Sequence, residues 1–333
     1  MSRIAILGGG SWGTGLAVVL AHSRRHHEIR MWVREPDIAR AIQENRENAV
    51  YLPGVALPDC VQATTEMREV LHDAQIVVGV VPSAFTREVF AQALPDIPVD
   101  AAIVSATKGL EPATRLRMSE VIEQVCSLRF VPQIAVLSGP SFALEAARGE
   151  PTAVVVASKG PLATFIQEEF AGPSFRLYTN YDVLGVELAG AMKNVMAIAA
   201  GACQGLGLGA NALAALITRG LAEMTRLTVA LGGKPETLSG LAGLGDLVLT
   251  CNGQLSRNRH VGFELGRGRA LQEILGEMKM VAEGVGTTEA LMVLARERGI
   301  ELPITEQVYS ILRLGNSPRD AIRAIMERPL RKE

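Results

Sequence analysis

Short apolar runs rich in β-branched residues alternate with segments of helical periodicity along the first half of the chain. This pattern predicts strands at 3–7, 28–33, 76–81, 101–106, 134–137, 152–157 and 175–178, and helices at 14–22, 86–94, 115–125 and 162–170. Strands that alternate with helices are typical of an α/β fold with a doubly wound, mostly parallel sheet.

The strand pattern ends near Thr179, and the rest of the chain has helical periodicity only. Helices are predicted at 183–200, 210–231, 255–267, 272–278, 288–298, 304–313 and 318–326. We therefore predict two domains, a sheet domain over 1–180 and an all-helical domain over 181–333.

One lysine stands at the edge of a long apolar stretch. Residues 187–219 are mostly small and apolar, and no residue from Val195 to Thr218 is charged, yet Lys193 and Asn194 lie beside this run. Burial of a lysine is costly without a partner, and burial lowers a lysine pKa toward that of a useful proton donor. A lysine that reaches solvent from a helix end is the structural alternative.

Composition and charge exclude several classes of protein. The chain is 48% hydrophobic and 20% charged, with a net charge of −2 and no basic stripe, which argues against nucleic acid as a partner. Its four cysteines form no CxxC pair and its five histidines show no metal-ligand spacing, which favours a reduced cytoplasmic protein without a metal. Glycines interrupt the uncharged run, so two buried helices around a glycine loop are expected there, not a membrane span.

A glycine-rich loop joins the first predicted strand to the first helix. It contains GxGxxG at Gly8, Gly10 and Gly13, where a dinucleotide pyrophosphate can approach the backbone closely. This context predicts a Rossmann-like domain. Arg34 follows the second strand where an acid would favour NAD, and its guanidinium can pair with a 2′-phosphate. NADP(H) is therefore the favoured cofactor. NAD(H) is also possible, because the acidic residue Glu35 lies beside Arg34.

Polar residues also follow other predicted strands. These are Pro82-Ser83, Thr107-Lys108-Gly109 and the turn that begins Ser138-Gly139-Pro140-Ser141. The carboxyl ends of parallel strands share one edge of a sheet, so these turns predict a ligand cleft there.

Two polar features are prominent in the helical half. Asp246 lies in a glycine-dense segment, predicted as a loop, and is either a helix N-cap or a charge partner of Lys193. The sequence Ser256-Arg257-Asn258-Arg259 precedes a helix and offers free N–H groups, a guanidinium and an amide to an anion. A phosphate site is the functional interpretation, and a solvated basic turn is the structural one.

The chain resembles bacterial NAD(P)-dependent glycerol-3-phosphate dehydrogenases over nearly its whole length. The motifs that carry the resemblance are GGGSWGTGLA (8–17), NAVYLPG (48–54), VVPS (80–83), ATKGLE (106–111), SGPSFALE (138–145), ELAGAMKNVMAIAAG (187–201), TRGLAEM (218–224), GLAGLGDLVLTC (240–251), SRNR (256–259) and PITE (303–306). The resemblance implies reversible reduction of dihydroxyacetone phosphate to sn-glycerol 3-phosphate, which supplies glycerophospholipid synthesis.

The resemblance also implies roles for individual residues. Lys193 is the expected general acid/base, and the residues around the reacting centre are Lys108, Asn194, Asp246 and Thr250. The substrate residues are Lys108, Gly139, Ser141, Lys193, Asp246, Ser256, Arg257 and Asn258. The cofactor residues are Gly8, Gly10, Ser11, Trp12, Gly13, Arg34, Lys108, Ala143, Arg257, Val281 and Glu283.

Two other functions are compatible with the general pattern. The first is a related two-domain dehydrogenase of hydroxy acids or ketoacids, which would not need a phosphate site. The second is a non-catalytic dinucleotide sensor, which would not need a Lys193–Asp246 pair. The apolar bulk of the helical half favours a homodimer.

Overall fold

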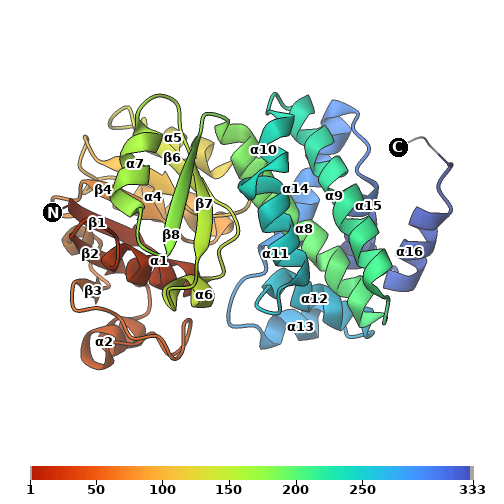
Figure 1. Cartoon of the computed structure of the whole chain (residues 1–333), viewed down its shortest axis with the longest axis horizontal. Coiled ribbons are helices and arrows are strands. Elements are labelled where there is room, and N and C mark those ends of the chain that lie inside the picture. The colour runs from red at the N-terminus through yellow and green to blue at the C-terminus, as the bar shows by residue number, and fades with distance from the viewer. Residues whose placement is uncertain (1, 331–333) are drawn as a thin grey trace. The chain divides into compact units, whose positions relative to one another are not determined.

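The computed structural model describes residues 2–330, and the chain divides into two compact units (Figure 1). Unit 1 comprises Met1–Glu111 and Leu116–Glu187, and unit 2 comprises Pro112–Arg115 and Leu188–Glu333. Each unit has its own organisation and is described separately below.

Unit 1 is built on an eight-stranded sheet in the order β3-β2-β1-β4-β5-β6-β7-β8. The strands are β1 (Ser2–Leu7), β2 (His27–Trp32), β3 (Val61–Thr64), β4 (Ile76–Gly79), β5 (Ala102–Ser105), β6 (Gln133–Ser138), β7 (Thr152–Ala157) and β8 (Phe175–Asn180). All neighbouring strands are parallel except β6 and β7, which are antiparallel. The order of the first six strands is that of a dinucleotide-binding doubly wound sheet. The predicted fold class is confirmed.

Helices cover both faces of this sheet (Figure 1). They are α1 (Ser11–Ala21), α2 (Pro36–Asn45), α3 (Met67–Leu71), α4 (Thr86–Ala93), α5 (Met118–Cys126), α6 (Ala143–Ala147) and α7 (Leu162–Phe170), with a short 3₁₀ turn at Ser83–Phe85. Successive strand residues point to opposite faces. Ile4 and Ile6 therefore belong to a core with α1, α2 and α7, whereas Ala5 and Leu7 belong to a second core with α3, α4 and α5. Burial on both faces explains the nearly continuous apolar strands.

Unit 2 is helical throughout its described part. Its helices are α8 (Val183–Gly205, which begins in unit 1), α9 (Ala210–Ala230), α10 (Pro235–Ser239), α11 (Asp246–Asn252), α12 (Arg257–Gly266), α13 (Leu271–Glu277), α14 (Glu283–Arg298), α15 (Pro303–Leu314) and α16 (Pro318–Met326). A π-helical turn, Leu241–Gly245, joins α10 to α11.

Glycines allow α8 and α12 to cross in backbone contact. A Cβ on Gly201 would lie 1.9 Å from the Arg259 carbonyl oxygen, and one on Gly262 would lie 1.9 Å from the Ile198 carbonyl oxygen. Real Cβ atoms cannot approach an oxygen so closely, so only glycine fits at this crossing. The contact holds α8, which carries Lys193 and Asn194, directly against the helix that follows Ser256.

A buried acid attaches α15 to α9. The carboxylate of Glu223 accepts hydrogen bonds from the backbone N–H groups of Ile304 and Thr305 at 2.8 and 2.9 Å. These groups belong to the first turn of α15, where no intrahelical acceptor exists. The burial of Glu223 raises its pKa, and the hydrogen bonds from Thr305 oppose that effect.

The structure differs from the sequence expectation in several elements. β3, α2 and α3 were not predicted, and α1 begins at Ser11 where a helix from 14 was expected. The segment 240–250 is not a loop, because a π-turn leads directly into α11. The uncharged run is interrupted by glycines as expected, but the first half of α9 is only partly buried. Asn211, Ala214 and Ala215 are exposed, so this half of α9 is not a core helix.

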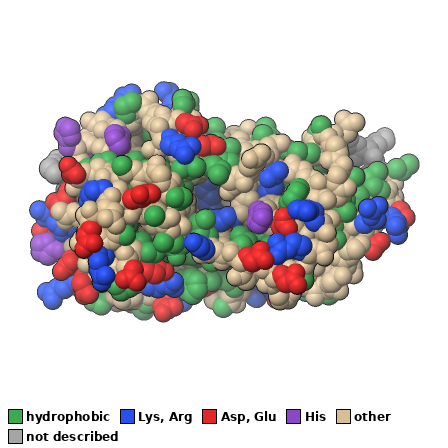
Figure 2. Space-filling model, turned by 90° about the horizontal axis from the view of Figure 1, so that it is seen from below, with side chains coloured by type: hydrophobic (Ala, Val, Ile, Leu, Met, Phe, Trp, Pro, Cys, Tyr) green, Lys and Arg blue, Asp and Glu red, His purple; other side chains and the backbone are tan. Residues whose placement is uncertain are grey.

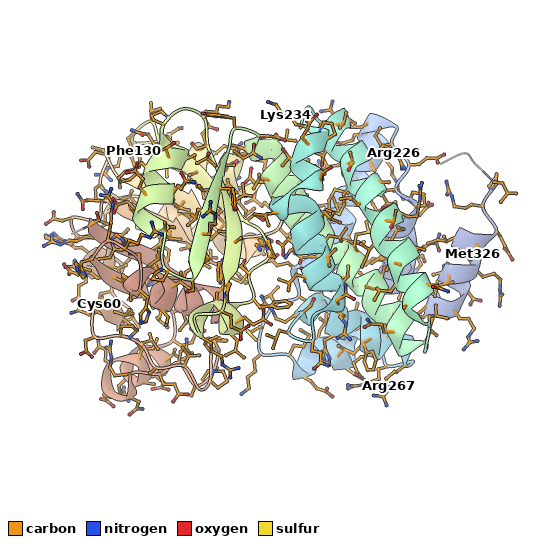
Figure 3. The ribbon with its side chains drawn as sticks, viewed as in Figure 1. Cys60, Phe130, Arg226, Lys234, Arg267 and Met326 are labelled. Carbon is orange, nitrogen blue, oxygen red and sulfur yellow. The ribbon has the colours of Figure 1, made fainter. Side chains whose placement is uncertain are left out.

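α8 is long and apolar enough to cross a membrane by length and composition, with a hydropathy of 1.4. However, 83% of its apolar window is buried inside the described structure, as in a core helix. The four cysteines are free thiols, and three of them are buried, whereas Cys60, labelled in Figure 3, is partly exposed. Figure 2 shows acidic and basic side chains interspersed over much of one face of the molecule.

Candidate active site

The glycine loop of unit 1 has the geometry of a phosphate-binding turn. Gly8 has φ +131°, and a Cβ on Gly13 would lie 2.0 Å from the Gly8 carbonyl oxygen, so both positions require glycine. Gly10 is the N-cap of α1, and a Cβ there would meet nothing within 4 Å. The first turn of α1 has neither a side-chain cap nor an acid. Its N–H groups are therefore free to bind an anion.

Two further observations fit a dinucleotide at this loop. The indole N–H of Trp12, in the first turn of α1, is buried and has no acceptor among the described residues. A donor left without an acceptor is costly, and a bound ligand can satisfy it. The open space at Gly10 leaves room for the approach of a pyrophosphate.

Asn48 supports this loop and was not predicted as a site residue. It is 1% exposed, and its amide donates hydrogen bonds of 2.8 Å to the Gly9 carbonyl and to the Thr14 hydroxyl. Its side-chain oxygen accepts from the Tyr51 N–H at 3.2 Å. Asn48 therefore fixes the turn without facing the ligand. The only signal in the sequence was its place in the NAVYLPG motif.

Arg34 follows β2, as the sequence predicts, and 71% of its side chain is exposed. Its guanidinium donates to the Glu35 carboxylate at 2.7 Å. The cation is thus accessible, but a neighbouring carboxylate already contacts it and would compete with a phosphate. The same carboxylate raises the pKa of Arg34 further, so the guanidinium remains charged.

Three predicted site residues meet at the carboxyl edge of the sheet. The Lys108 ammonium donates to the Gly139 carbonyl at 2.7 Å and to the Ser141 hydroxyl at 3.3 Å. The Ser141 hydroxyl also donates to the Gly139 carbonyl at 2.8 Å. Gly139 has φ +130°, and a Cβ there would lie 3.0 Å from Val154 Cα. Ala143 begins α6 and packs against Gly15 of α1, which brings this turn next to the phosphate loop.

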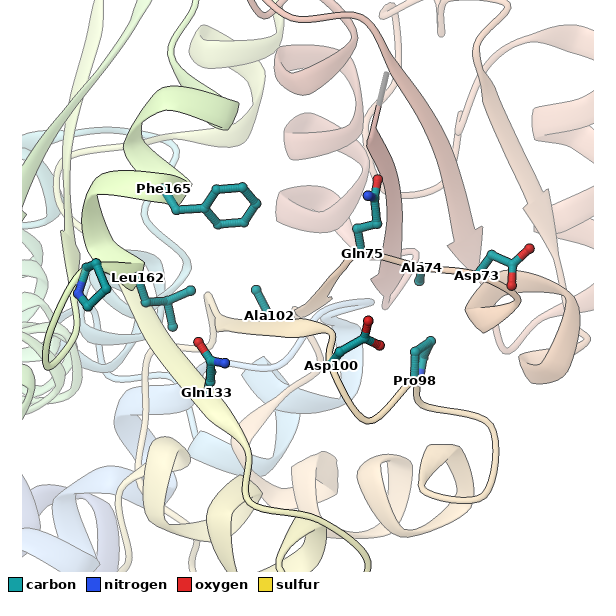
Figure 4. A pocket seen from close by; sticks show the side chains of 10 residues that line it. Asp73, Ala74, Gln75, Pro98, Asp100, Ala102, Gln133, Leu162 and Phe165 are labelled. Carbon is teal, nitrogen blue, oxygen red and sulfur yellow. The ribbon is translucent and has the colours of Figure 1, made fainter.

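A hollow of about 540 Å³ lies at the opposite edge of unit 1 (Figure 4). Gln75, Ala102 and Gln133 line it at or just before the first residues of β4, β5 and β6, and the ring of Phe165 points across it. Ligands of doubly wound sheets bind beyond the carboxyl ends of the strands. This amino-edge hollow is therefore not the cofactor site.

The polar centre of unit 2 is a buried ion pair. Lys193 Nζ donates to Asp246 Oδ1 at 2.5 Å and to the Thr250 hydroxyl at 3.0 Å. The exposed fractions of Lys193 and Asp246 are 6% and 0%. Asp246 is the first residue of α11, and the N-cap of that helix is Gly245, so the N-cap alternative is wrong. The alternative of a lysine that reaches solvent is also wrong, and the charge-partner interpretation holds.

A chain of amides connects this centre to two other helices. The Asn258 amide donates to the Asn194 side-chain oxygen at 2.9 Å, and the Asn258 oxygen accepts from the Gly284 N–H at 2.9 Å. These bonds join α8, α12 and the start of α14. Asn258 therefore uses one donor and its oxygen inside the protein, and one amide proton is left for a ligand.

The start of α12 is a capped helix terminus with basic side chains. Ser256 is its N-cap and accepts from the Arg259 N–H at 3.2 Å, as the sequence predicts. Arg257 is exposed, and its charge interacts with that of Glu283, the first residue of α14. Val281, two residues before Glu283, is 44% exposed. Arg257 and Glu283 thus relate the start of α12 to the start of α14 in unit 2.

The buried thiol that follows Thr250 in α11 is not a nucleophile. Cys251 is adjacent to Thr250 and fully buried, and burial raises its pKa to about 12. A nucleophilic cysteine needs its thiolate form. Within the described residues, no group of three or more histidine, cysteine, aspartate or glutamate side chains could hold a metal ion.

A doubly wound sheet with an open phosphate loop, followed by a helical unit with a buried lysine, defines a two-domain dinucleotide-dependent dehydrogenase. The comparisons with known proteins agree. Residues 3–163 match the family "NAD-dependent glycerol-3-phosphate dehydrogenase N-terminus", and residues 182–323 match the corresponding C-terminus family.

Individual relatives match over the whole chain. The chain is 54% identical to a glycerol-3-phosphate dehydrogenase [NAD(P)+] of Koribacter versatilis, with 99% of this chain and 98% of the relative covered. It is 50% identical to that of Citrifermentans bemidjiense, with the same coverage. A crystal structure of glycerol-3-phosphate dehydrogenase from Coxiella burnetii is 43% identical, with a TM-score of 0.93 over 98% of this chain and 99% of that chain. The chain belongs to the NAD-dependent glycerol-3-phosphate dehydrogenase family, and the resemblance predicted from its motifs is confirmed.

Proposed function

We propose that this protein catalyses the reversible NAD(P)H-dependent reduction of dihydroxyacetone phosphate to sn-glycerol 3-phosphate. The observation that carries the proposal is the buried Lys193 ammonium, held by Asp246 and Thr250. A buried, hydrogen-bonded ammonium offers a proton at a fixed position, which is what a ketone needs when it becomes an alcohol. Family membership supplies the substrate class.

Each polar residue of the centre has a distinct role in this proposal. The nicotinamide cofactor, when bound, supplies the hydride. Lys193 Nζ donates the proton to the oxygen that develops negative charge, and Asp246 and Thr250 hold Nζ in place. Lys108 adds a second positive charge for that oxygen. Asn194 and Asn258 hold the part of α8 that carries Lys193, since they bond to each other and Asn258 also bonds to the start of α14.

The substrate phosphate belongs at the start of α12. Ser256, Arg257 and Asn258 offer a helix N-terminus, a guanidinium and one free amide proton, and the first turn of α12 contains no acid. This combination suits a dianion. In unit 1 the same proposal assigns Gly139 and Ser141 to the substrate. Binding of the remote phosphate orients the carbonyl for reaction.

The cofactor belongs at the glycine loop of the domain over 1–180, and the catalytic and substrate residues belong mainly to the domain over 181–333. The residues proposed to contact the cofactor are Gly8, Gly10, Ser11, Trp12, Gly13, Arg34, Lys108, Ala143, Arg257, Val281 and Glu283. NADP(H) is favoured over NAD(H) because Arg34 is an accessible cation beside the ribose position. The proposal includes a cytoplasmic homodimer that supplies glycerophospholipid synthesis.

Initial rates with two ketones test the reaction. Dihydroxyacetone phosphate and dihydroxyacetone are compared with NADPH and with NADH at saturating cofactor. The proposal expects kcat/KM for the phosphorylated ketone to exceed that for dihydroxyacetone by at least about a hundredfold, because phosphate contacts are charge-assisted. Equal kcat/KM for the two ketones would eliminate the phosphate site, and no NAD(P)H oxidation with either would eliminate the reaction.

A further inference from the structure

A second cavity of about 600 Å³ lies in unit 2, outside the residues assigned to catalysis. It is bounded by the end of α13, the segment 278–282, one face of α14, the end of α15 and the turn 112–115. Its volume is in the range typical of pockets for small organic ligands. Of the residues in its wall, only Val281 has been assigned to the cofactor.

The floor of this cavity is mainly apolar, with Glu289 as its one charged residue. Val285, Glu289 and Val293 lie four residues apart along α14, so they share one face of the helix. Leu275, Met278 and Met280 also line the cavity and, like Val285 and Val293, are only partly buried. Methionine and branched aliphatic side chains adapt well to a flexible alkyl chain. A bound alkyl chain would remove this partly exposed apolar surface from water.

The rim of the cavity is cationic. Arg115, Lys279 and Arg313 line it against a single carboxylate, that of Glu289, which pairs with Arg313 at 2.9 Å. Arg115 is 3.7 Å from Glu297, and the side chain of Lys279 is exposed. Arg115 also has φ +65°, a strained conformation for a residue with a side chain. Such strain at a pocket rim is common where a side chain must be held for a ligand.

From this floor and rim we propose that the cavity binds a single-chain anionic amphiphile, such as an alkyl phosphate, as a monomer. The alkyl chain lies along Val285 and Val293, and the anionic head contacts Lys279 with Arg115 and Arg313 nearby. Three cations against the two carboxylates of Glu289 and Glu297 leave the rim with a net positive charge, which favours an anion over a cation. The apolar floor selects an amphiphile over a free phosphate.

Calorimetric titration of the full chain tests the proposal without cofactor or substrate, so its outcome is independent of the proposed function. Dodecyl phosphate, below its micelle concentration, is expected to bind at one site per chain. Dodecyl maltoside has the same alkyl chain without the charge, and inorganic phosphate has the charge without the chain. Both are expected to bind at least about tenfold more weakly.

Variants locate the binding site. Lys279→Glu is expected to weaken the binding of dodecyl phosphate about tenfold, because an attractive surface contact becomes repulsive. Val293→Ser is expected to weaken it several-fold, since part of the apolar floor is lost. Lys159→Glu, an exposed lysine of unit 1, is the matched control and leaves the affinity unchanged. Unchanged affinity in both pocket variants, or binding only to anionic vesicles and never to the monomer, would overturn the proposal.

Discussion

Lys193 and Asp246 are 53 residues apart in the sequence, and their side chains meet at 2.5 Å in an environment from which water is nearly excluded. Burial of an ion pair seldom increases stability, because the desolvation cost offsets the attraction. A fold that keeps such a pair therefore keeps it for another reason. The proposed proton transfer from Lys193 supplies that reason.

The first prediction separates stability from chemistry at this pair. Asp246→Asn leaves a buried ammonium without its counter-charge and is expected to destabilise unit 2 by about 3–5 kcal/mol. The double variant Lys193→Met with Asp246→Leu removes both charges and is expected to recover most of that stability while it remains inactive. Chemical denaturation and steady-state rates measure the two effects. An active double variant would disprove the catalytic role of the pair.

The second prediction concerns the cofactor preference. Arg34→Ala is expected to weaken the binding of NADPH about fivefold and to change the binding of NADH little, because only NADPH carries a 2′-phosphate. Glu35→Gln removes the carboxylate that now pairs with Arg34 and is expected to strengthen NADPH. Dissociation constants from nicotinamide fluorescence measure both. Equal losses for the two cofactors in Arg34→Ala would show that Arg34 does not contact the phosphate.

The third prediction tests the crossing of α8 and α12. Gly201→Ala puts a methyl group into the Arg259 carbonyl and is expected to destabilise the protein by about 1–3 kcal/mol or more. Gly276→Ala is the matched control, because Gly276 lies in α13 with nothing within 4 Å of its Cβ position. That change is expected to stabilise slightly, as alanine favours helix. Equal melting temperatures for the two variants would argue against the close crossing.

The fourth prediction follows from a buried thiol in unit 1. Burial raises the pKa of Cys126 to about 11. The folded protein therefore holds the thiol proton of Cys126 more tightly than the unfolded chain does, because a cysteine thiol in an unfolded chain has a pKa of about 8.5. Stability is therefore lost as pH rises from about 8.5 toward 11, by at most about 1.4 kcal/mol per pH unit. The free energy of unfolding, measured with urea from pH 7 to 10.5, is expected to fall less steeply with pH in Cys126→Ala than in the unmodified protein. Parallel pH dependences for the two proteins would contradict this expectation.

Strand–helix alternation predicted the sheet of unit 1 well, because strands buried on both faces leave continuous apolar runs such as Ile76–Gly79. The sequence pattern did not predict β3, because Val61–Thr64 is short and has polar residues at alternate positions. The π-turn before α11 was hidden by its glycines. Its hydrogen bond from the Gly245 N–H to the Gly240 carbonyl needs no side chain and leaves no pattern in the sequence.

In the candidate site too, some residues could be predicted from the sequence and others could not. Lys193 and Asp246 are isolated charges in apolar segments, so their pairing follows from the cost of burial. Asn48 could not be found in this way, because its role depends on a contact with Gly9 across 39 residues. The exposure of Asn211, Ala214 and Ala215 was also hidden, since an uncharged composition does not show which face of a helix is covered.

The most direct test of the central claim is the Lys193→Ala variant, with Lys159→Ala as an exposed-lysine control. NADPH affinity and the melting profile are measured first, to show that the fold and the cofactor site persist. The rate of dihydroxyacetone phosphate reduction is then measured at saturating NADPH. The account predicts that kcat falls by about 10² to 10⁴ in Lys193→Ala and stays unchanged in the control. A near-normal kcat in a folded, NADPH-binding Lys193→Ala variant would contradict it.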